Sequence, residues 1–520
     1  MNKKPKIVLL QVSGDTYEYW DFYPPLGLAS IASYLKVHNK VPKNNLLILD
    51  SKIPVFKRII LAFKPDIIGI SCFSNNYQRT VQVARELKKL LPNTLFILGG
   101  VHISLFPDTL DGVFDFAVLK EGEVVFSEII DSWSNYQKSK NKNVFFDIKS
   151  IAYKNKNKII TTPIRELIFP LDNIPQIDYS LLPNLFFRYE IVKDNEKQLW
   201  SLKKVFPLFT ARGCPYKCIF CARSALWERV RFFSPKRIVD EIKNLQEYGV
   251  EAIQIWDDIF ALNTERLLKI EKSMKKAKIL KNIQFYRVFA RTDLFTTDMV
   301  KQLKKLNVKS VAFGLESGSE RILKYLKRDT TTVKINTEAV DLCEKENIGF
   351  VACIMLGIPN EKPEDMDKTL KFIENLNSLN TLEAIDTARA TPFPATELYE
   401  YAIKKGLISE DFGTKSKYLS LVDTSNEIPI LIKNKKDVKA YKFYWKKIKS
   451  YEESLRQLNS KQKGYKLSFI KMKILNKINR FLFLPKYLLN LIKKRRWVFT
   501  FRICYFIFYR FLEKFVLFKK

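Results

Sequence analysis

The feature that most constrains the fold is an alternation of short apolar runs and amphipathic segments, which occurs twice along the chain. In the first series, the apolar runs cover residues 6–12, 45–50, 66–73, 94–100 and 114–123. Helical spacing is found at 24–37 and 76–91. Nearly continuous apolar runs are typical of strands buried on both faces of a parallel sheet. The series predicts an α/β fold that starts with a doubly wound, Rossmann-like domain over residues 1–140.

A second series of apolar runs covers residues 205–211, 252–258, 284–290, 310–317, 349–359 and 384–394. Amphipathic stretches such as 235–249 and 298–307 separate these runs. Six strands with crossover helices predict a partial (β/α)6 TIM-type barrel over residues 201–425. In both folds, ligands bind at the carboxyl ends of the strands.

Two further segments complete the predicted organisation. Residues 141–200 are rich in Lys and Asn and are interrupted by prolines, which predicts a connector. Residues 426–520 predict a helical, basic C-terminal extension.

The composition limits the environment and the partners. No secretion signal opens the chain, and seven scattered cysteines do not suggest a disulfide framework, so we expect a cytoplasmic protein. The net charge of +34 would ordinarily suggest nucleic acid as a partner. However, residues 471–520 hold fourteen Lys or Arg against one Glu, and the remaining excess is spread along the chain. We therefore do not expect nucleic acid to be a partner.

Three cysteines stand within eight residues: Cys214, Cys218 and Cys221. A structural zinc site needs four Cys or His ligands, but the two histidines, His38 and His102, both belong to the other predicted domain. A packing role in the core is a second alternative. Three thiolates can instead hold a [4Fe–4S] cluster at three corners and leave the fourth iron open for a small ligand.

This C-x3-C-x2-C loop, placed after the first barrel strand, resembles that of the radical S-adenosylmethionine superfamily. The aromatic Phe220 before the last cysteine also matches that family. The resemblance implies that the open iron binds the amino and carboxylate groups of S-adenosylmethionine. An electron from the cluster would then cleave the C–S bond and give a 5′-deoxyadenosyl radical.

The resemblance also implies cofactor contacts at the ends of later strands. Asp257 and Asp258 would meet the amino group of the methionine moiety, although a helix N-cap is an alternative for either. Glu316 and Ser317 would face the ribose and methionine portions, and the adenine would lie near Gly357.

Two positions near these contacts carry separate expectations. We expect Ser319 to be a helix N-cap. The acidic residue that the family has after Gly357 could be matched here by Asn360 or Glu361.

Residues 1–425 resemble one branch of the superfamily, the cobalamin-binding radical S-adenosylmethionine enzymes. The local matches in the first domain are 24–36, 98–108 and 118–123. Gly99 and Gly100 would let a corrin or its nucleotide tail approach the backbone, and a generic nucleotide site is the alternative.

The chain departs from this branch after the second strand. Many cobalamin domains carry D-x-H-x-x-G there, but residues 50–55 read Asp-Ser-Lys-Ile-Pro-Val. We therefore expect cobalamin to bind without a protein histidine on cobalt. His102 is expected to be a surface or supporting residue rather than an axial ligand.

A related activity, methylthiotransfer, needs three more cysteines in the first domain, but the first 200 residues contain only Cys72. Cys343, Cys353 and Cys504 are expected to be small buried hydrophobic residues.

By resemblance, the predicted activity is methylation of an unactivated carbon on a small-molecule or lipid substrate. Methylcobalamin would give the methyl group, a second S-adenosylmethionine would restore it, and a flavodoxin or ferredoxin would supply electrons. No side chain is expected to act as a general base. Radical rearrangement or cyclisation without methyl transfer is one alternative, and a non-catalytic, membrane-associated binding protein is another.

The last segment carries thirteen aromatic residues between positions 481 and 518, interleaved with Lys and Arg. Its longest run without a charge is seven residues, 503–509, which is too short to span a membrane. Aromatic and basic residues together predict a helix lying on the anionic inner face of the membrane. The alternative is a helical subdomain packed on the barrel.

Overall fold

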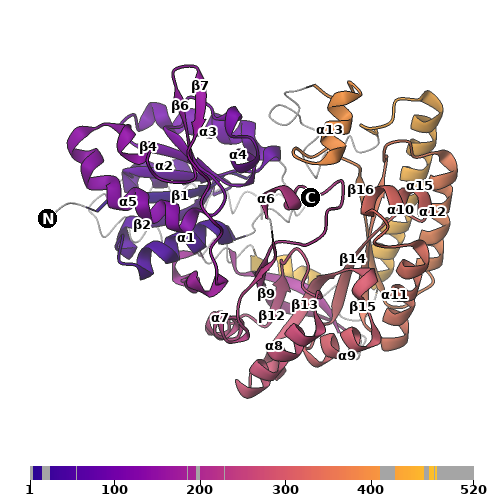
Figure 1. The fold of residues 1–520 in the computed structure, drawn as a ribbon. Helices are drawn as coiled ribbons and strands as arrows, with labels where there is room; N and C mark the ends of the chain where they lie inside the picture. Colours follow the sequence, from indigo (N-terminus) through magenta and orange to yellow (C-terminus); the bar gives the residue numbers. More distant parts are fainter. Residues whose placement is uncertain are drawn as a thin grey trace, which may run out of the picture.

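The computed structural model describes residues 4–13, 24–53, 55–183, 186–194, 199–227, 229–409, 428–461, 468–473 and 475–476. Figure 1 shows two α/β units side by side, with a layer of helices on the far side of the second unit. The expected fold class is confirmed, because a doubly wound sheet precedes an open barrel sheet.

The first unit is built on five parallel strands: β1 (Ile7–Gln11), β2 (Leu46–Asp50), β3 (Ile67–Ser71), β4 (Leu95–Gly99) and β5 (Phe116–Val118). They lie in the order β2-β1-β3-β4-β5, so the order reverses between β1 and β3. Its helices are α1 (Leu26–Val37), α2 (Phe56–Phe63), α3 (Tyr77–Leu90), α4 (Val101–Leu105) and α5 (Gly122–Ser139). Ligands of such sheets bind at the carboxyl edge near the reversal.

The segment expected to be a connector contains three strands. β6 (Ile151–Asn155) and β7 (Lys158–Thr161) form an antiparallel hairpin that extends the first sheet beyond β5. β8 (Arg188–Asp194) pairs antiparallel with the first strand of the second sheet. The hairpin has no apolar run in the sequence, because β7 is an edge strand and edge strands are commonly polar and lysine-rich at their exposed positions.

The second unit has six parallel strands: β9 (Leu199–Leu208), β12 (Ala252–Ile255), β13 (Gln284–Ala290), β14 (Ser310–Glu316), β15 (Gly349–Leu356) and β16 (Leu382–Arg389). The sheet order is β16-β15-β14-β13-β12-β9-β8, which is an open half-barrel. Its crossover helices are α7 (Pro235–Glu247), α8 (Thr264–Lys276), α9 (Thr297–Lys305), α10 (Glu320–Lys327), α11 (Val333–Glu346) and α12 (Pro363–Leu376).

Short elements decorate the carboxyl edge of this sheet, and a long helix follows it. They are the ribbon β10 (Ala211–Arg212) and β11 (Arg231–Phe232), then α6 (Arg223–Leu226), α13 (Glu397–Lys404) and α15 (Lys435–Lys461). Eight 3-10 turns complete the described elements: Lys43–Asn45, Ser74–Asn76, Pro107–Thr109, Lys142–Phe145, Leu171–Asn173, Tyr179–Leu181, Leu280–Asn282 and Thr292–Leu294.

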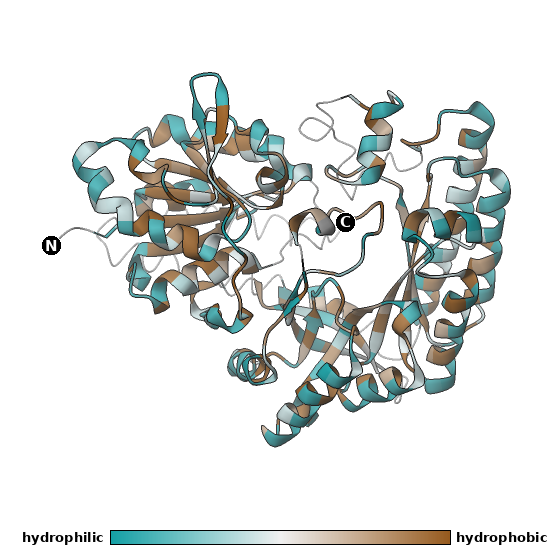
Figure 2. Cartoon of the chain, viewed as in Figure 1, coloured by the Kyte–Doolittle hydropathy of each residue, from teal (hydrophilic) through white to brown (hydrophobic). Residues whose placement is uncertain are grey.

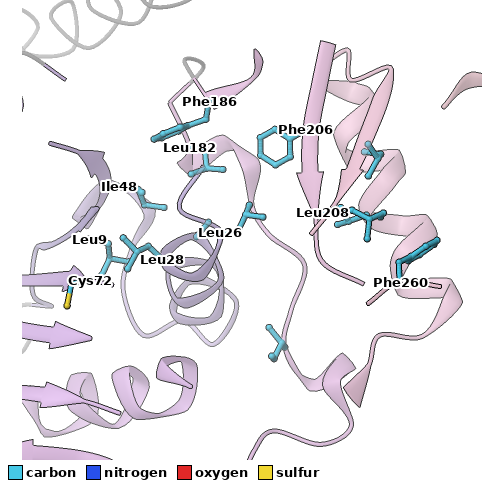
Figure 3. Packing of buried hydrophobic residues seen from close by; sticks show 14 of the residues in the cluster. Leu9, Leu26, Leu28, Ile48, Cys72, Leu182, Phe186, Phe206, Leu208 and Phe260 are labelled. Carbon is cyan, nitrogen blue, oxygen red and sulfur yellow. The ribbon is translucent and has the colours of Figure 1, made fainter. Parts of the chain in front are cut away.

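One buried hydrophobic cluster joins the two units. Figure 3 shows Leu182 and Phe186 of the connector near Leu26 of α1 and Phe206 of β9, and all four belong to the same cluster. Figure 2 shows that the strands inside both units are mainly hydrophobic, whereas the outer faces of the helices are hydrophilic. The units therefore share a core rather than a flexible tether.

α15 is the outer layer of the last barrel strand. It packs against α12 and β16, and its inward side chains include Tyr441, Trp445 and Ile448, all buried. Among the described residues, no helix has the length and apolar character needed to cross a membrane. The basic aromatic segment predicted to lie on the membrane, residues 481–518, lies outside the described residues.

Candidate functional site

The three clustered cysteines lie on a loop between β10 and α6. The loop opens at Gly213, whose φ of +102° favours glycine, and a Cβ there would lie 2.6 Å from the carbonyl oxygen of Arg229. Within the loop, the backbone N–H of Cys221 donates to the carbonyl of Cys218 at 3.0 Å. The glycine therefore lets the chain turn tightly into the cysteine loop.

Two backbone hydrogen bonds fasten this loop to the second unit. The N–H of Ile219 donates to the carbonyl of Leu326 at the end of α10, at 3.1 Å. The carbonyl of Ile219 accepts from the N–H of Leu398 in α13, at 3.3 Å. Because Ile219 is also buried, the loop is fixed to the second unit on the Ile219 side, while its cysteines stay partly exposed.

The thiols lie near one another in a partly desolvated site. Burial raises the pKa of Cys214 and Cys221, and the neighbouring thiolates add to the effect. Within the described part of the chain, no three His, Cys, Asp or Glu side chains converge as ligands of a single ion. The thiolates of a [4Fe–4S] cluster bind separate irons, so they need not converge on one ion.

Arg291, at the end of β13, is a neighbour of the loop that sequence reasoning missed. Its Nη1 lies 3.9 Å from Sγ of Cys218, and its guanidinium lies 3.5 Å from the ring centroid of Tyr216. Its Nε pairs with the carboxylate of Asp293 at 2.9 Å. The only available signal was its place directly after a predicted strand. A fixed cation here offsets negative charge on the thiolates.

Asp257 is held inside the protein. Its carboxylate accepts hydrogen bonds from the backbone N–H groups of Thr210 at 2.5 Å and Ala211 at 3.0 Å, and Arg266 lies 3.9 Å away. The residue therefore ties the end of β12 to the segment after β9. The N-cap alternative is wrong for both aspartates, because Asn263 caps α8.

Asp258 lies beside the cysteine loop. It forms an ion pair with Arg223 of α6, two residues after Cys221. Its second oxygen, Oδ2, is buried and has no hydrogen-bond partner among the described residues. Of the two aspartates, this one has a carboxylate oxygen available for a ligand.

Glu316 occupies a strained position at the end of β14. Its φ is +62° and the strand register shifts there, while burial raises the pKa of its carboxyl and Lys327, 3.7 Å away, opposes that rise. The glutamate also contributes to the raised pKa of Cys221, which places its charge near the loop. Gly314 leaves room for it, since a Cβ there would overlap the Glu316 carboxylate. Buried non-glycine residues with positive φ are concentrated at functional sites.

The two serines after Glu316 support the turn into α10. Ser317 is buried, and its hydroxyl lies 3.0 Å from that of Thr369 and accepts from the N–H of Ser319 at 3.1 Å. Ser319 is the N-cap residue of α10, as expected, but its hydroxyl donates to Asp365 at 2.6 Å instead of capping the helix.

Gly357 follows β15 with a φ of +83°, and a Cβ there would lie 3.0 Å from the ring of Tyr441 in α15. Glu361 accepts from the N–H groups of Gly357 at 2.7 Å and Ile358 at 3.1 Å. Glu361, not Asn360, is thus the buried acid of this turn, and burial raises its pKa to about 8.

In the first unit, the paired glycines have different roles. Gly100 has a φ of +100°, and a Cβ there would lie 2.5 Å from the carbonyl oxygen of Cys72 at the end of β3. No such conflict exists at Gly99, where the nearest atom would be 3.8 Å away. The close approach at Gly100 is therefore between two segments of this chain, while Gly99 has ordinary space around it.

Both histidines of the chain lie in the first unit. His102 is buried rather than on the surface, its Nδ1 lies 2.9 Å from the Ser74 hydroxyl and its Nε2 lies 3.0 Å from the Thr109 hydroxyl. Burial lowers the pKa of His102 to about 4. His38 lies at the end of α1, on the edge of the sheet opposite the carboxyl ends. That cobalamin binds without a protein histidine on cobalt stays a prediction.

The loop after β2 is ordered by Asp50 instead. Its carboxylate accepts from the N–H of Lys52 at 2.8 Å, from Nε2 of Gln11 at 2.9 Å and from the hydroxyl of Ser13. These bonds tie the loop to the end of β1, and no imidazole stands in it.

The carboxyl edge of the first sheet meets the cysteine loop. α4, which starts right after Gly100, contacts α6, which starts right after the loop. Figure 1 shows α6 between the two units. The ligand-binding edges of both sheets therefore face the same junction. Which of the residues above touch the cofactors stays a prediction.

Comparisons with known proteins agree with this arrangement. Residues 18–130 match the B12 binding domain, and residues 208–373 match the Radical SAM superfamily. An uncharacterized methyltransferase of Pyrococcus horikoshii is 30% identical over 393 residues, which are 74% of this chain and 80% of that protein. An anaerobic magnesium-protoporphyrin IX monomethyl ester cyclase of Rubrivivax gelatinosus is 26% identical over 73% of this chain and 66% of its own length.

Among solved structures, the cobalamin-dependent S-adenosylmethionine radical enzyme OxsB, with aqua-cobalamin and S-adenosylmethionine bound, has the same fold. Its TM-score is 0.65 at 15% identity, covering 94% of this chain and 79% of OxsB. With a B12-binding domain followed by a radical SAM domain that contains the three-cysteine loop, the chain belongs to the cobalamin-dependent radical S-adenosylmethionine enzymes, which use a [4Fe–4S] cluster, S-adenosylmethionine and cobalamin.

Proposed function

We propose that this enzyme methylates an unactivated carbon of a small-molecule or lipid substrate. The observation that carries the proposal is the contact between α4 and α6, which places the cysteine loop beside the carboxyl edge of the cobalamin-binding sheet. The Pyrococcus relative, a methyltransferase by its name, supports the same reaction class.

When bound, the cluster and S-adenosylmethionine supply a 5′-deoxyadenosyl radical, and cobalamin carries the methyl group. The protein holds the reacting groups in place. Cys214, Cys218 and Cys221 would bind three irons, and Arg291 would balance charge beside them. Asp258 would offer its buried oxygen to the amino group of S-adenosylmethionine.

The remaining predicted contacts belong to later strands. Glu316 would accept from the ribose hydroxyls, with Ser317 holding the turn, and the adenine would lie near Gly357. Gly99 has the space to admit a corrin or its nucleotide tail. A reductant such as a flavodoxin or ferredoxin would supply the electron. No acid or base is assigned, because the chemistry is radical and not proton transfer.

A second function is cyclisation or rearrangement without methyl transfer. The Rubrivivax relative favours it, because that protein is named a cyclase. The two functions differ in how they consume S-adenosylmethionine. Methyl transfer gives one 5′-deoxyadenosine and one S-adenosylhomocysteine per turnover, whereas cyclisation needs only the radical.

The test uses anaerobically reconstituted full-length protein, reduced cobalamin and S-adenosylmethionine with a trideuterated methyl group. We expect S-adenosylhomocysteine and trideuteromethyl-cobalamin by mass spectrometry, without any substrate. Replacing Cys214, Cys218 and Cys221 with Ala should abolish the cluster absorbance and 5′-deoxyadenosine formation. Radical cleavage without corrin methylation would favour the second function, and binding of zinc in place of iron would refute both.

A further inference from the structure

Four charged side chains connect the cysteine loop to the first unit. Arg212 of β10 donates to Glu121 at 2.6 Å and to Glu123 at 2.7 Å. Arg231 of β11 donates twice to Glu121, at 2.9 and 3.0 Å. The two arginines flank the cysteine loop in the sequence, and the two glutamates flank the start of α5. We call these four residues the junction network.

The junction network is buried, and each of its charges has an oppositely charged partner. Its side chains are between 0 and 19% exposed, and its two positive and two negative charges balance. Glu123 also accepts from the hydroxyl of Ser30 at 2.7 Å. Burial alone would raise the pKa of Glu123, but Arg212 and Ser30 hold it below its ordinary value.

The connector also takes part in the network, through two backbone hydrogen bonds of Ile168. The backbone N–H of Ile168 donates to Glu121 at 2.8 Å, and its carbonyl accepts from Arg231 at 2.7 Å. A bidentate guanidinium–carboxylate pair fixes orientation as well as distance. The network therefore fixes three segments of the chain relative to one another.

Its position links two sites. Glu121 and Glu123 follow β5, so they stand at the carboxyl edge of the first sheet, where cobalamin is expected. Arg212 precedes Cys214 by two residues. Radical transfer depends on small differences in the distance and orientation of reacting groups.

We propose that the junction network is a positioning device, which sets the distance between the cysteine loop and the carboxyl edge of the first sheet. We assign its members as positioning residues, which act through the cysteine loop and the edge of the first sheet. The proposal does not require methyl transfer, but its first readout uses bound cobalamin and so rests on the proposed function.

Another ion pair of α5 provides the control for substitutions in the junction network. Glu128 of α5 pairs with Arg165 of the connector at 2.5 Å, away from the cysteine loop. The variants are Glu123→Gln, which leaves Arg212 with an excess positive charge, and Arg212→Lys, which keeps the charge but loses the planar fork. Glu128→Gln is the control.

The first readout is the distance between cob(II)alamin and the reduced cluster in the holoenzyme, measured by pulsed dipolar electron paramagnetic resonance. We expect one narrow distribution in the wild type and in Glu128→Gln. Glu123→Gln and Arg212→Ala should broaden it and shift it to longer distance, and Arg212→Lys should give a narrower distribution than Arg212→Ala. An unchanged distribution in folded, cluster-loaded Glu123→Gln overturns the proposal.

A second readout separates failure of this proposal from failure of the proposed function. If wild-type protein binds no cobalamin, the reduced cluster alone is measured with S-adenosylmethionine added. Broader lines in the electron paramagnetic resonance spectrum of the cluster in Glu123→Gln and Arg212→Ala, but not in Glu128→Gln, still support positioning of the loop. Identical spectra in all four proteins refute it.

Discussion

At the scale of single residues, Glu361 carries a proton that it would lose in an unfolded chain. Its Oε2 accepts two backbone N–H groups, while its Oε1 is buried without a hydrogen-bond partner among the described residues. Burial raises the pKa from 4.5 to about 8, so the folded carboxyl is largely neutral at pH 7.

This raised pKa predicts how stability depends on pH. Because the folded state binds the proton more tightly, the contribution of Glu361 to the free energy of unfolding is greatest below pH 4.5 and is lost as the pH rises through about 8. The full effect is at most about 5 kcal/mol. Glu361→Gln cannot ionise, so we expect it to melt at a higher temperature than wild type at pH 9 and at a similar temperature at pH 5.

The control is Glu364→Gln, since Glu364 is an exposed acid three residues away. It should leave the pH profile of thermal unfolding unchanged. If Glu361→Gln follows the wild-type profile from pH 5 to pH 9, the carboxyl of Glu361 is ionised in the folded protein.

Which residues could be found from the sequence depends on how local their signal is. The three cysteines were identifiable because their spacing lies within one loop. The junction network was not, because Arg212 meets Glu121 and Glu123 across about ninety residues of chain. Residues 118–123 match the cobalamin-binding branch, yet nothing in them indicates an arginine partner.

At the scale of elements, α15 covers the edge strand of the half-barrel. Glu452 accepts from the N–H of Thr387 at 2.7 Å, and Asn459 donates to the carbonyl of Glu383 at 2.9 Å. These side chains satisfy backbone groups of β16. The helix therefore belongs to the barrel even though it follows the matched family region.

Trp445 and Phe443 of α15 give a matched pair of substitutions. Trp445 is buried against the barrel, whereas Phe443 is 56% exposed on the same helix. Trp445→Ala should lower the free energy of unfolding by about 3–5 kcal/mol, and Phe443→Ala by less than about 0.5 kcal/mol. Chemical denaturation followed by circular dichroism measures both. Equal losses would mean that α15 is not packed as described.

Element prediction succeeded where burial leaves a continuous apolar run. The five parallel strands of the first sheet and the six of the second match the predicted runs, because both faces of each are covered. β6, β7 and β8 were missed because they lie at or near sheet edges, where composition is freer. The division at residues 140, 200 and 425 stays a prediction, although the first sheet extends to Thr161.

At the scale of the whole molecule, the basic aromatic segment predicts contact with an anionic membrane. A chain that ends at Lys477 keeps Asn476, which donates to the carbonyl of Tyr189 and accepts from its N–H, both at 2.9 Å. We expect this shortened protein to fold and to lose sedimentation with vesicles rich in phosphatidylserine. Each basic residue near such a surface contributes about 1 kcal/mol.

Neutral phosphatidylcholine vesicles are the control, since they should sediment neither protein. If the full chain ignores anionic vesicles, or if the shortened chain unfolds, the segment is a structural part of the enzyme instead.

The fold class could be predicted at this scale, but the mutual placement of the two sheets could not. It depends on contacts such as that of Phe187 with Phe206, whose ring centroids are 4.7 Å apart, and on the junction network, which no local pattern encodes.

The shared core has a consequence for exchanging parts between relatives. Leu182 and Phe186 of the connector contribute to the packing of both units. A hybrid protein that joins two relatives within the connector would therefore place these side chains against a unit from the other relative. A hybrid with a borrowed substrate specificity would need its seam outside this packing, on the exposed outer helices. Members of such a family can therefore differ in their surface helices and loops, while the contacts that pair the two units are kept.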